Sequence, residues 1–247
     1  MVIPTFNRRD GVGGAIESIR HQTFEDFELL VVDDGSTDGT AAVLRERYRD
    51  DDRIHVLEKP NRGCGSARNH GIVRARGELV AYLDSDDHAE SERLARQVEA
   101  LDAHPEADLC LVDARLEDGE GRPVGTMYAH SGFVAPTSLE AMFQAAWAAP
   151  STWMLRTEVA RALPFDEAIR YQEDVDFLFR FLRAGHRVVM IPDVLVRYQV
   201  DEDARGEGRM SGNRPAMDAW WARIHRENWE RLTPAARREI HRPPHVH

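Results

Sequence analysis

Short apolar runs alternate with segments of helical periodicity through the first half of the chain. Each run ends at a turn or at a polar residue, as expected for a buried strand. Between the runs, apolar side chains such as Val12, Ile16 and Ile19 recur every three or four residues, which predicts helices. Strands are expected at residues 1–3, 27–32, 53–57, 78–83 and 108–112.

This alternation indicates an α/β fold with a mostly parallel central sheet flanked by helices. Right-handed crossovers place the carboxyl ends of such strands at one edge of the sheet. Ligands of open α/β sheets bind at that edge. Functional residues are therefore expected directly after the strands.

The second half of the chain is less regular. The segment Asp118-Gly119-Glu120-Gly121 predicts a turn between two extended segments. A helix is expected at residues 173–183, with Gly185 as its C-cap. Other extended segments are expected at residues 151–155, 187–191 and 194–198.

The last part of the chain combines an irregular segment with a tryptophan-rich one. Residues 201–213 are rich in glycine and charge, so a mobile loop is expected there. From Pro215 the pattern is helical again and carries Trp220, Trp221 and Trp229. Three interpretations of this helix stay open: packing onto the domain, a homodimer contact, and docking of an acceptor or a membrane surface.

The composition narrows the class of protein. A net charge of -11 argues against a nucleic-acid partner, because phosphate neutralisation needs clustered Lys and Arg. Cys64 and Cys110 have no metal-binding spacing and are expected to be reduced thiols. There is no apolar run of membrane-spanning length and no signal-peptide pattern at residues 1–7. We expect a cytoplasmic protein, with peripheral attachment to a membrane left open.

The run Asp84-Ser85-Asp86-Asp87 directly follows the strand expected at residues 78–83. Three carboxylates in such a turn repel one another unless a cation joins them, and a hard divalent cation prefers oxygen ligands. Such a cation could also hold the phosphates of a nucleoside diphosphate. A solvated acidic turn or a helix N-cap is the alternative at this point.

The first and second expected strands, at residues 1–3 and 27–32, also end in polar motifs. Pro4-Thr5-Phe6-Asn7 could hold a base and a ribose, although a simple strand-to-helix turn explains it equally well. The strand also has few residues before Pro4, so the chain is expected either to begin upstream of Met1 or to have a short first strand.

Asp33-Asp34-Gly35-Ser36 ends the second strand. Ser36 or Asp38 could cap the next helix. Capping leaves two adjacent acids unexplained, and one carboxylate could accept the N–H of a uracil or guanine ring.

Two further motifs begin predicted helices. The small residues from Gly63 to Asn69 permit close approach of an anion to a helix N-terminus, but they match neither a Walker A loop nor a dinucleotide fingerprint. Glu173-Asp174 suits the first turn of a helix. One of its carboxylates could instead act as a general base toward an acceptor hydroxyl.

Taken together, these motifs resemble the family 2 glycosyltransferases of GT-A fold. The resemblance covers roughly residues 1–200, and its specificity comes from five motifs in the family's order. They are Pro4-Thr5-Phe6-Asn7, Asp33-Asp34-Gly35-Ser36, Ala67-Arg68-Asn69-His70-Gly71, Asp84-Ser85-Asp86-Asp87 and Glu173-Asp174.

The resemblance implies a Rossmann-like GT-A domain at residues 1–205, followed by a mobile loop and a C-terminal helical extension at 206–247. The nucleotide-binding half would be 1–114 and the acceptor-side half 115–205. It also implies inverting, metal-dependent transfer of a sugar from a nucleotide-sugar donor, usually a UDP-sugar.

The resemblance also assigns individual residues. Asp174 would be the catalytic base, and Asp84 and Asp86 would hold Mn²⁺ or Mg²⁺, with Asp86 nearest the metal. Thr5, Phe6, Asp34 and Arg68 would lie near the base and the ribose. The implied donor-binding set is Pro4, Thr5, Phe6, Asn7, Asp33, Asp34, Arg68, Asp84 and Ser85.

Departures and alternatives remain. The sequence lacks the Gln-x-x-Arg-Trp motif of processive synthases, which favours transfer of a single sugar, and Arg209-Met210-Ser211 could lie over the phosphates. A sugar nucleotidyltransferase would carry a Gly-rich basic loop after the first strand, and residues 6–14 lack that arrangement. A silent nucleotide-sugar-binding protein is disfavoured by the intact carboxylates. The acceptor stays open among a saccharide, a lipid-linked glycan and a natural product.

Overall fold

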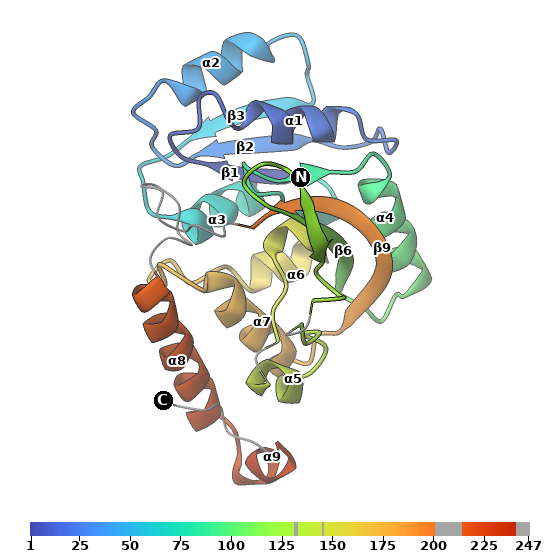
Figure 1. The fold of residues 1–247 in the computed structure, drawn as a ribbon, viewed down its shortest axis with the longest axis vertical. Coiled ribbons are helices and arrows are strands. Elements are labelled where there is room, and N and C mark those ends of the chain that lie inside the picture. Colours follow the sequence, from blue (N-terminus) through green and yellow to red (C-terminus); the bar gives the residue numbers. More distant parts are fainter. Residues whose placement is uncertain (131–132, 145, 201–213, 241–247) are drawn as a thin grey trace.

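The computed structural model describes residues 1–130, 133–144, 146–200 and 214–240 (Figure 1). The first sheet is parallel, with strand order β1-β2-β3. Its strands are β1 (Val2–Thr5), β2 (Leu29–Asp33) and β3 (Ile54–Glu58). All three lie where the apolar runs predict strands, which brings the motifs after β1 and β2 side by side.

The second sheet is mixed and has the order β4-β8-β6-β9-β5, with β7 paired to β6. A parallel bridge from Val2 to Tyr82 joins the two sheets beside β4. The α/β fold is confirmed, although β8 runs antiparallel between β4 and β6. The strands are β4 (Leu79–Ala81), β5 (His88–Ala89), β6 (Leu109–Glu117), β7 (Pro123–Thr126), β8 (Trp153–Arg156) and β9 (Val188–Gln199).

β6 and β9 are longer than the segments predicted from the sequence, whereas β4 is shorter. β6 continues to Glu117 because its distal half pairs with β7 on one side and with β9 on the other. The two extended segments expected at 187–191 and 194–198 form one strand, β9, which stays continuous through register shifts opposite Asp113. The turn at residues 118–121 connects β6 to β7 as predicted.

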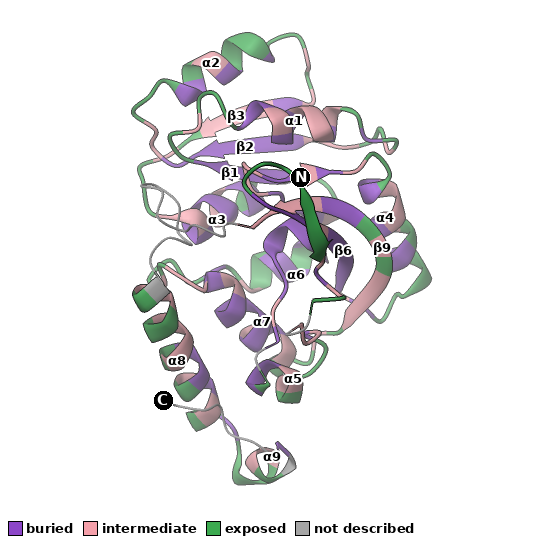
Figure 2. Ribbon diagram, viewed as in Figure 1, coloured by how far each residue is buried: buried purple, intermediate pink, exposed green. Residues whose placement is uncertain are grey.

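Helices cover both faces of the sheets, and their exposed sides face outward (Figure 2). On one face α1 and α4 pack over Ile3 and Val31, and on the other α3, α6 and α7 pack over Val2 and Leu30. Neighbouring residues of β1 and β2 point to opposite faces of the sheet, so each strand contributes side chains to both hydrophobic cores. The helices of the main domain are α1 (Gly13–Arg20), α2 (Thr40–Arg47), α3 (Cys64–Arg74), α4 (Arg93–Ala103), α5 (Leu139–Phe143), α6 (Thr157–Ala162) and α7 (Glu173–Arg183), with a 3-10 turn η1 (Pro150–Thr152).

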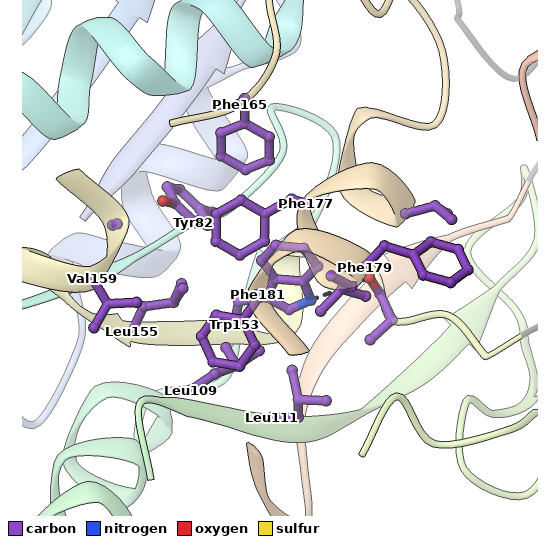
Figure 3. Close-up of a cluster of buried hydrophobic side chains, with 14 of the residues drawn as sticks. Tyr82, Leu109, Leu111, Trp153, Leu155, Val159, Phe165, Phe177, Phe179 and Phe181 are labelled. Atoms are coloured by element: carbon purple, nitrogen blue, oxygen red, sulfur yellow. Dashed lines mark hydrogen bonds between the residues drawn. The ribbon is translucent and has the colours of Figure 1, made fainter. Parts of the chain in front are cut away.

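Aromatic side chains from β8, α7, the segment after β4 and the loop between α6 and α7 form a cluster in the hydrophobic core (Figure 3). Phe165 stacks on Phe177 with ring centroids 4.9 Å apart, and Tyr82 meets Phe165 edge-on at 5.8 Å. Trp153 is fully buried among them, and its indole N–H donates to the carbonyl oxygen of Ala148 at 3.1 Å. Such rings give this part of the domain a rigid apolar base.

Of the C-terminal helices α8 (Arg214–Glu230) and α9 (Pro234–Glu239), α8 packs against α7, and α9 follows at its far end (Figure 1). Trp229 meets Phe143 at 5.3 Å, and the buried His225 ring lies 3.1 Å from the Met142 carbonyl oxygen. Packing onto the domain thus accounts for Trp221 and Trp229, which border the core. A homodimer contact stays a prediction. No helix in the described part of the chain has the length and apolarity needed to cross a membrane.

The close contact between α3 and β1 depends on Gly71. A Cβ atom built there would lie 2.6 Å from Cγ1 of Val2 and 2.8 Å from its Cγ2. We expect Gly71→Ala to lower the free energy of unfolding by about 1–3 kcal/mol, because overpacking outweighs the helix propensity of alanine. Urea denaturation checks this against Gly119→Ala, where nothing lies within 4 Å of the added Cβ. Equal stability of the two variants would contradict the tight packing.

Candidate active site

The acidic run after β4 is held by a network that separates its carboxylates into two environments. The backbone N–H of Asp84 donates to Oγ of Ser151 at 2.9 Å, and that hydroxyl donates to Oδ2 of Asp87 at 2.5 Å. The Gln199 N–H donates to the other oxygen of Asp87 at 3.1 Å. Asp87 is buried, and burial, reinforced by its acidic neighbours, raises its pKa well above the ordinary value. Asp87 therefore anchors the loop, while Asp84, Ser85 and Asp86 stay partly exposed.

Arg68 of α3 joins this loop to α7. Its Nη2 donates to Oδ1 of Asp84 at 2.7 Å, and its Nη1 donates to Oε1 of Glu173 at 2.8 Å. The side chain is 2% exposed, and its guanidinium lies 5.4 Å from the centroid of the Phe165 ring. Three segments far apart in the sequence thus meet at one buried guanidinium. Its neighbours place Arg68 at the acidic centre, whereas its predicted contact with the base or ribose stays a prediction.

Asp174 follows Glu173 in the first turn of α7, just after Gln172 in a left-handed conformation with φ +64°. Burial and the adjacent Glu173 carboxylate raise the pKa of Asp174 to about 7, against the opposing effect of Arg68. Its Oδ1 accepts the N–H of Val175 at 2.9 Å. A carboxyl group with this pKa changes charge near neutral pH, as a general base requires.

Tyr198, near the end of β9, provides a second sign that these acids converge. Burial, together with the carboxylates of Asp87, Asp84 and Asp174, raises the pKa of its phenol well above the ordinary value. The loop after β4 and the start of α7 therefore both influence the protonation of this tyrosine. Sequence analysis did not single out Tyr198, because its place beside the acids depends on the parallel pairing of β9 with β6.

The two acids at the end of β2, Asp33 and Asp34, are paired with other groups of the chain. Oδ1 of Asp33 accepts the N–H of Ser36 at 2.7 Å and closes the turn. Asp34 pairs with the ammonium group of Lys59 and accepts the N–H groups of Arg62 and Gly63, at 3.0 and 2.7 Å respectively. Asp34 thus shapes the loop that leads into α3. Lys59 was missed because only the fold brings the end of β3 beside Asp34.

The predicted capping of α2 by Ser36 is wrong. The residue before the helix is Gly39, and the Ser36 hydroxyl accepts the N–H of Asn7 at 2.8 Å instead. Asp38, the other candidate, does bind the first turn, because its Oδ1 accepts the N–H of Thr40 at 3.0 Å.

The motif after β1 presents an aromatic ring at the same edge. Pro4 and Thr5 are buried in β1, whereas Phe6 is 44% exposed. Asn7, with φ +50°, accepts the N–H of Thr37 through Oδ1 at 2.8 Å and so fixes the loop to the next turn. Oγ1 of Thr5 is buried with no hydrogen-bond partner among the described residues. Phe6 and Asn7 are therefore the exposed members of this motif, and Thr5 contributes a buried hydroxyl whose hydrogen-bonding capacity is unused among the described residues.

Two partly exposed carboxylates, Asp84 and Asp86, could hold a metal ion, and each is paired with an arginine, Arg68 and Arg8 respectively. Across the described ranges, no three His, Cys, Asp or Glu side chains gather into a site made by protein alone. This donor set still fits Mg²⁺ or Mn²⁺ in a nucleotide site, because Mg²⁺ is usually held by one or two carboxylates together with substrate phosphates. The expected loop at 201–213, with Arg209-Met210-Ser211, lies outside the described residues.

A cavity of about 670 Å³ lies at the opposite, amino-terminal edge of the strands. Met1, Glu28 and Leu79 are among its lining residues. None of the candidate site residues lines it, so the cavity and the acidic cluster are separate features.

Solved structures share this arrangement of sheets and helices. S. aureus TarS 1–349 in complex with UDP-GlcNAc has a TM-score of 0.74 and 24% identity, covering 97% of this chain and 69% of that one. Mannosyltransferase PcManGT from Pyrobaculum calidifontis, in complex with GDP-Man and Mn²⁺, has a TM-score of 0.68 and 20% identity, covering 97% of this chain and 66% of that one. At these identities the likeness shows the fold.

Sequence relatives cover the chain to different extents. Glycosyltransferase GlyG of Streptococcus pneumoniae is 26% identical, and the match covers 90% of this chain and 75% of GlyG. A Campylobacter jejuni GalNAc(5)-diNAcBac-PP-undecaprenol beta-1,3-glucosyltransferase is 42% identical over 89 residues, which are 35% of this chain and 29% of that protein. Three Bacillus subtilis glycosyltransferases also match this chain, and the matched regions cover 34% to 64% of their lengths.

The family profile decides the assignment. The profile described as Glycosyl transferase family 2 matches residues 1–163 of the 247 residues. The match includes the four motifs up to Asp87 and ends before Glu173-Asp174. On this match, the chain belongs to glycosyl transferase family 2.

Proposed function

We propose that this chain transfers a single sugar from a UDP-sugar to an acceptor hydroxyl, with inversion at the anomeric carbon. One observation carries the proposal: the buried guanidinium of Arg68 joins the Asp84 loop to the helix of Asp174 through ion pairs with Asp84 and Glu173. In this proposal, the ion pairs keep the donor-binding loop close to the base, Asp174, whose pKa is about 7.

The donor side is proposed at the ends of β1, β2 and β4. The exposed Phe6 ring offers a stacking surface for a base, and the Thr5 hydroxyl offers a hydrogen bond. Asp34 would contact the base or the ribose after exchanging one of its present partners, such as Lys59. The related structures solved with UDP-GlcNAc and GDP-Man support a nucleotide-sugar donor in general, and UDP follows the family preference.

The chemistry needs one base and no enzyme nucleophile. The acceptor oxygen attacks the anomeric carbon from the face opposite the diphosphate, and its proton passes to Asp174. A C–O bond to the acceptor forms as the bond to the phosphate oxygen breaks, and the nucleoside diphosphate leaves with the bonding electrons. A divalent cation bound at Asp84 and Asp86 would neutralise charge on the leaving diphosphate.

The acceptor is proposed to bind in the half formed by residues 115–205, next to Asp174. The names of the related enzymes point to glycans and lipid-linked glycans as acceptor classes. A sugar nucleotidyltransferase is disfavoured because residues 6–14 lack a Gly-rich basic loop. A silent binding protein is disfavoured by the intact set of carboxylates, Asp84, Asp86 and Asp174.

A thermal-shift panel of nucleotides and nucleotide sugars, with and without Mn²⁺, tests the proposal. A ligand at 100 times its Kd adds about 2.7 kcal/mol of stability, roughly 5–10 °C for a domain of this size. UDP or a UDP-sugar with Mn²⁺ should give the largest shift in the wild-type protein. Asp86→Ala should lose the Mn²⁺-dependent part of that shift and the metal-dependent release of UDP from the donor.

Three outcomes would contradict the proposal. A shift with GDP or dTDP but not with UDP would overturn the donor assignment. Full metal-dependent turnover by Asp86→Ala would overturn the metal role. Release of pyrophosphate from a nucleoside triphosphate and a sugar phosphate would favour the nucleotidyltransferase instead.

A further inference from the structure

Arg8 lies in the loop after β1 and reaches across the site to Asp86. Its Nη2 donates to Oδ2 of Asp86 at 3.1 Å, and the two side chains are 27% and 29% exposed. The position proposed for a divalent cation is therefore bordered by a guanidinium from the chain itself. This contact joins the loop after β1 to the loop after β4, independently of the Arg68 ion pairs.

The backbone of Arg8 is fixed on several sides. Its N–H donates to Oγ1 of Thr40 at 3.2 Å, and its carbonyl oxygen accepts the N–H groups of Gly11 and Val12 at 3.0 and 3.1 Å. The neighbouring Arg9 N–H donates to Oδ2 of Asp38 at 3.1 Å. The main chain of Arg8 is held by these hydrogen bonds. Its long side chain could therefore exchange Asp86 for another anion without movement of the loop.

A guanidinium and a divalent cation oppose each other at the same carboxylate. A free cation approaching Asp86 meets the positive charge of Arg8 and must displace it. A cation that arrives with a diphosphate brings its own negative oxygens. These oxygens can accept the fork of N–H groups from Arg8 as it leaves Asp86.

We propose that Arg8 makes this site select a cation–diphosphate complex over a free divalent cation, by holding Asp86 until a diphosphate replaces that carboxylate as its partner. This inference rests on the proposed function, because the diphosphate is that of the nucleotide sugar. Metal and nucleotide then bind cooperatively, and each raises the affinity of the site for the other by the same factor.

Calorimetry and electron paramagnetic resonance of Mn²⁺ test this selectivity without any acceptor. Binding of Mn²⁺ alone, of UDP alone, and of Mn²⁺ at saturating UDP is measured for the wild type, Arg8→Ala, Arg8→Lys and Arg9→Ala. Arg9→Ala is the matched control, since that exposed side chain is adjacent and the hydrogen bond from Arg9 to Asp38 uses the backbone N–H. Circular dichroism confirms that each variant is folded.

Arg8→Ala is expected to bind free Mn²⁺ about two- to fivefold more tightly, the range that a partly exposed ion pair allows. It should bind Mn²⁺ and UDP together about tenfold more weakly, because a charge-assisted contact to phosphate is lost. Arg8→Lys should bind free Mn²⁺ as weakly as the wild type, since it keeps the charge. It should recover only part of the affinity for UDP. Arg9→Ala should match the wild type.

Unchanged or weaker binding of free Mn²⁺ by Arg8→Ala would overturn the competition. An unchanged coupling factor between Mn²⁺ and UDP would overturn the exchange onto the diphosphate. A wild-type protein that binds Mn²⁺ but no nucleotide would instead overturn the proposed function, so the two failures are distinguishable.

Discussion

Asp174→Asn is expected to reduce turnover by about two to four orders of magnitude while donor binding stays close to that of the wild type. The amide keeps the shape of the side chain but cannot take the proton of the acceptor hydroxyl. Donor affinity should survive because the proposed nucleotide contacts come from the ends of β1, β2 and β4. Binding and proton transfer are thus separate tasks in this site.

The measurement compares kcat with the Kd for the donor, obtained by calorimetry on the same preparation. Asp166→Asn is the control, because that exposed acid lies in the loop leading to α7 and binds the N–H of Ala168 nearby. Wild-type turnover by Asp174→Asn would place the base elsewhere. A parallel loss of donor binding would show that Asp174 holds the donor instead.

The pKa of about 7 at Asp174 gives this prediction a pH dependence. The base works only when deprotonated, so kcat/KM in the wild type should rise with pH through about 7 and then level off. The native pKa exceeds the ordinary 3.8, so the folded state binds more protons between these values and stability falls as pH rises across that window. Asp174→Asn should therefore melt higher than the wild type at pH 8, and by a smaller margin at pH 5.

The placement of the main site residues follows from the sequence because strand ends share an edge in a sheet with right-handed crossovers. This argument brings Asp34 and Asp84 to one rim, and the structure confirms that they lie there. Glu173 and Asp174 begin α7 as predicted, since acids suit the first turn of a helix. These features depend on local patterns and on one topological rule.

The pairing of charges could not be predicted in the same way. Arg8 meets Asp86, Lys59 meets Asp34, and Ser151 meets Asp87 across 78, 25 and 64 positions respectively. No periodicity links such residues, because each pair depends on the exact path of two loops. The antiparallel insertion of β8 between β4 and β6 is equally non-local, and it is what brings Ser151 to the acidic loop.

The ion pairs of Arg68 could not be predicted from its motif. The resemblance implies contact with the base or ribose, which stays a prediction, and in the structure the two terminal nitrogens donate to the carboxylates of Asp84 and Glu173. A helix residue can be placed on a face from periodicity, but its partner is decided by what the fold brings opposite. Here that partner is α7, more than a hundred residues later.

Arg68→Met is expected to lower the free energy of unfolding by about 3–5 kcal/mol, because it leaves the buried Glu173 carboxylate without its cation. The methionine fills much of the space over Phe165 but cannot donate to either acid. Removing the charge should also raise the pKa of Asp174, since Arg68 now lowers it. The acid limb of the pH profile should then move to higher pH in any activity that remains.

Urea denaturation of a double-mutant cycle separates the lost ion pair from lost packing. Glu173→Gln in the Arg68→Met background removes the stranded charge, so the double variant should be more stable than Arg68→Met alone. Arg180→Met provides the control on α7, because its partner Asp176 lies one turn away on the same helix. If the double variant lost as much stability as the two single variants added together, the pair would make no joint contribution. Arg68 would then act on the site through packing rather than by joining Asp84 to α7.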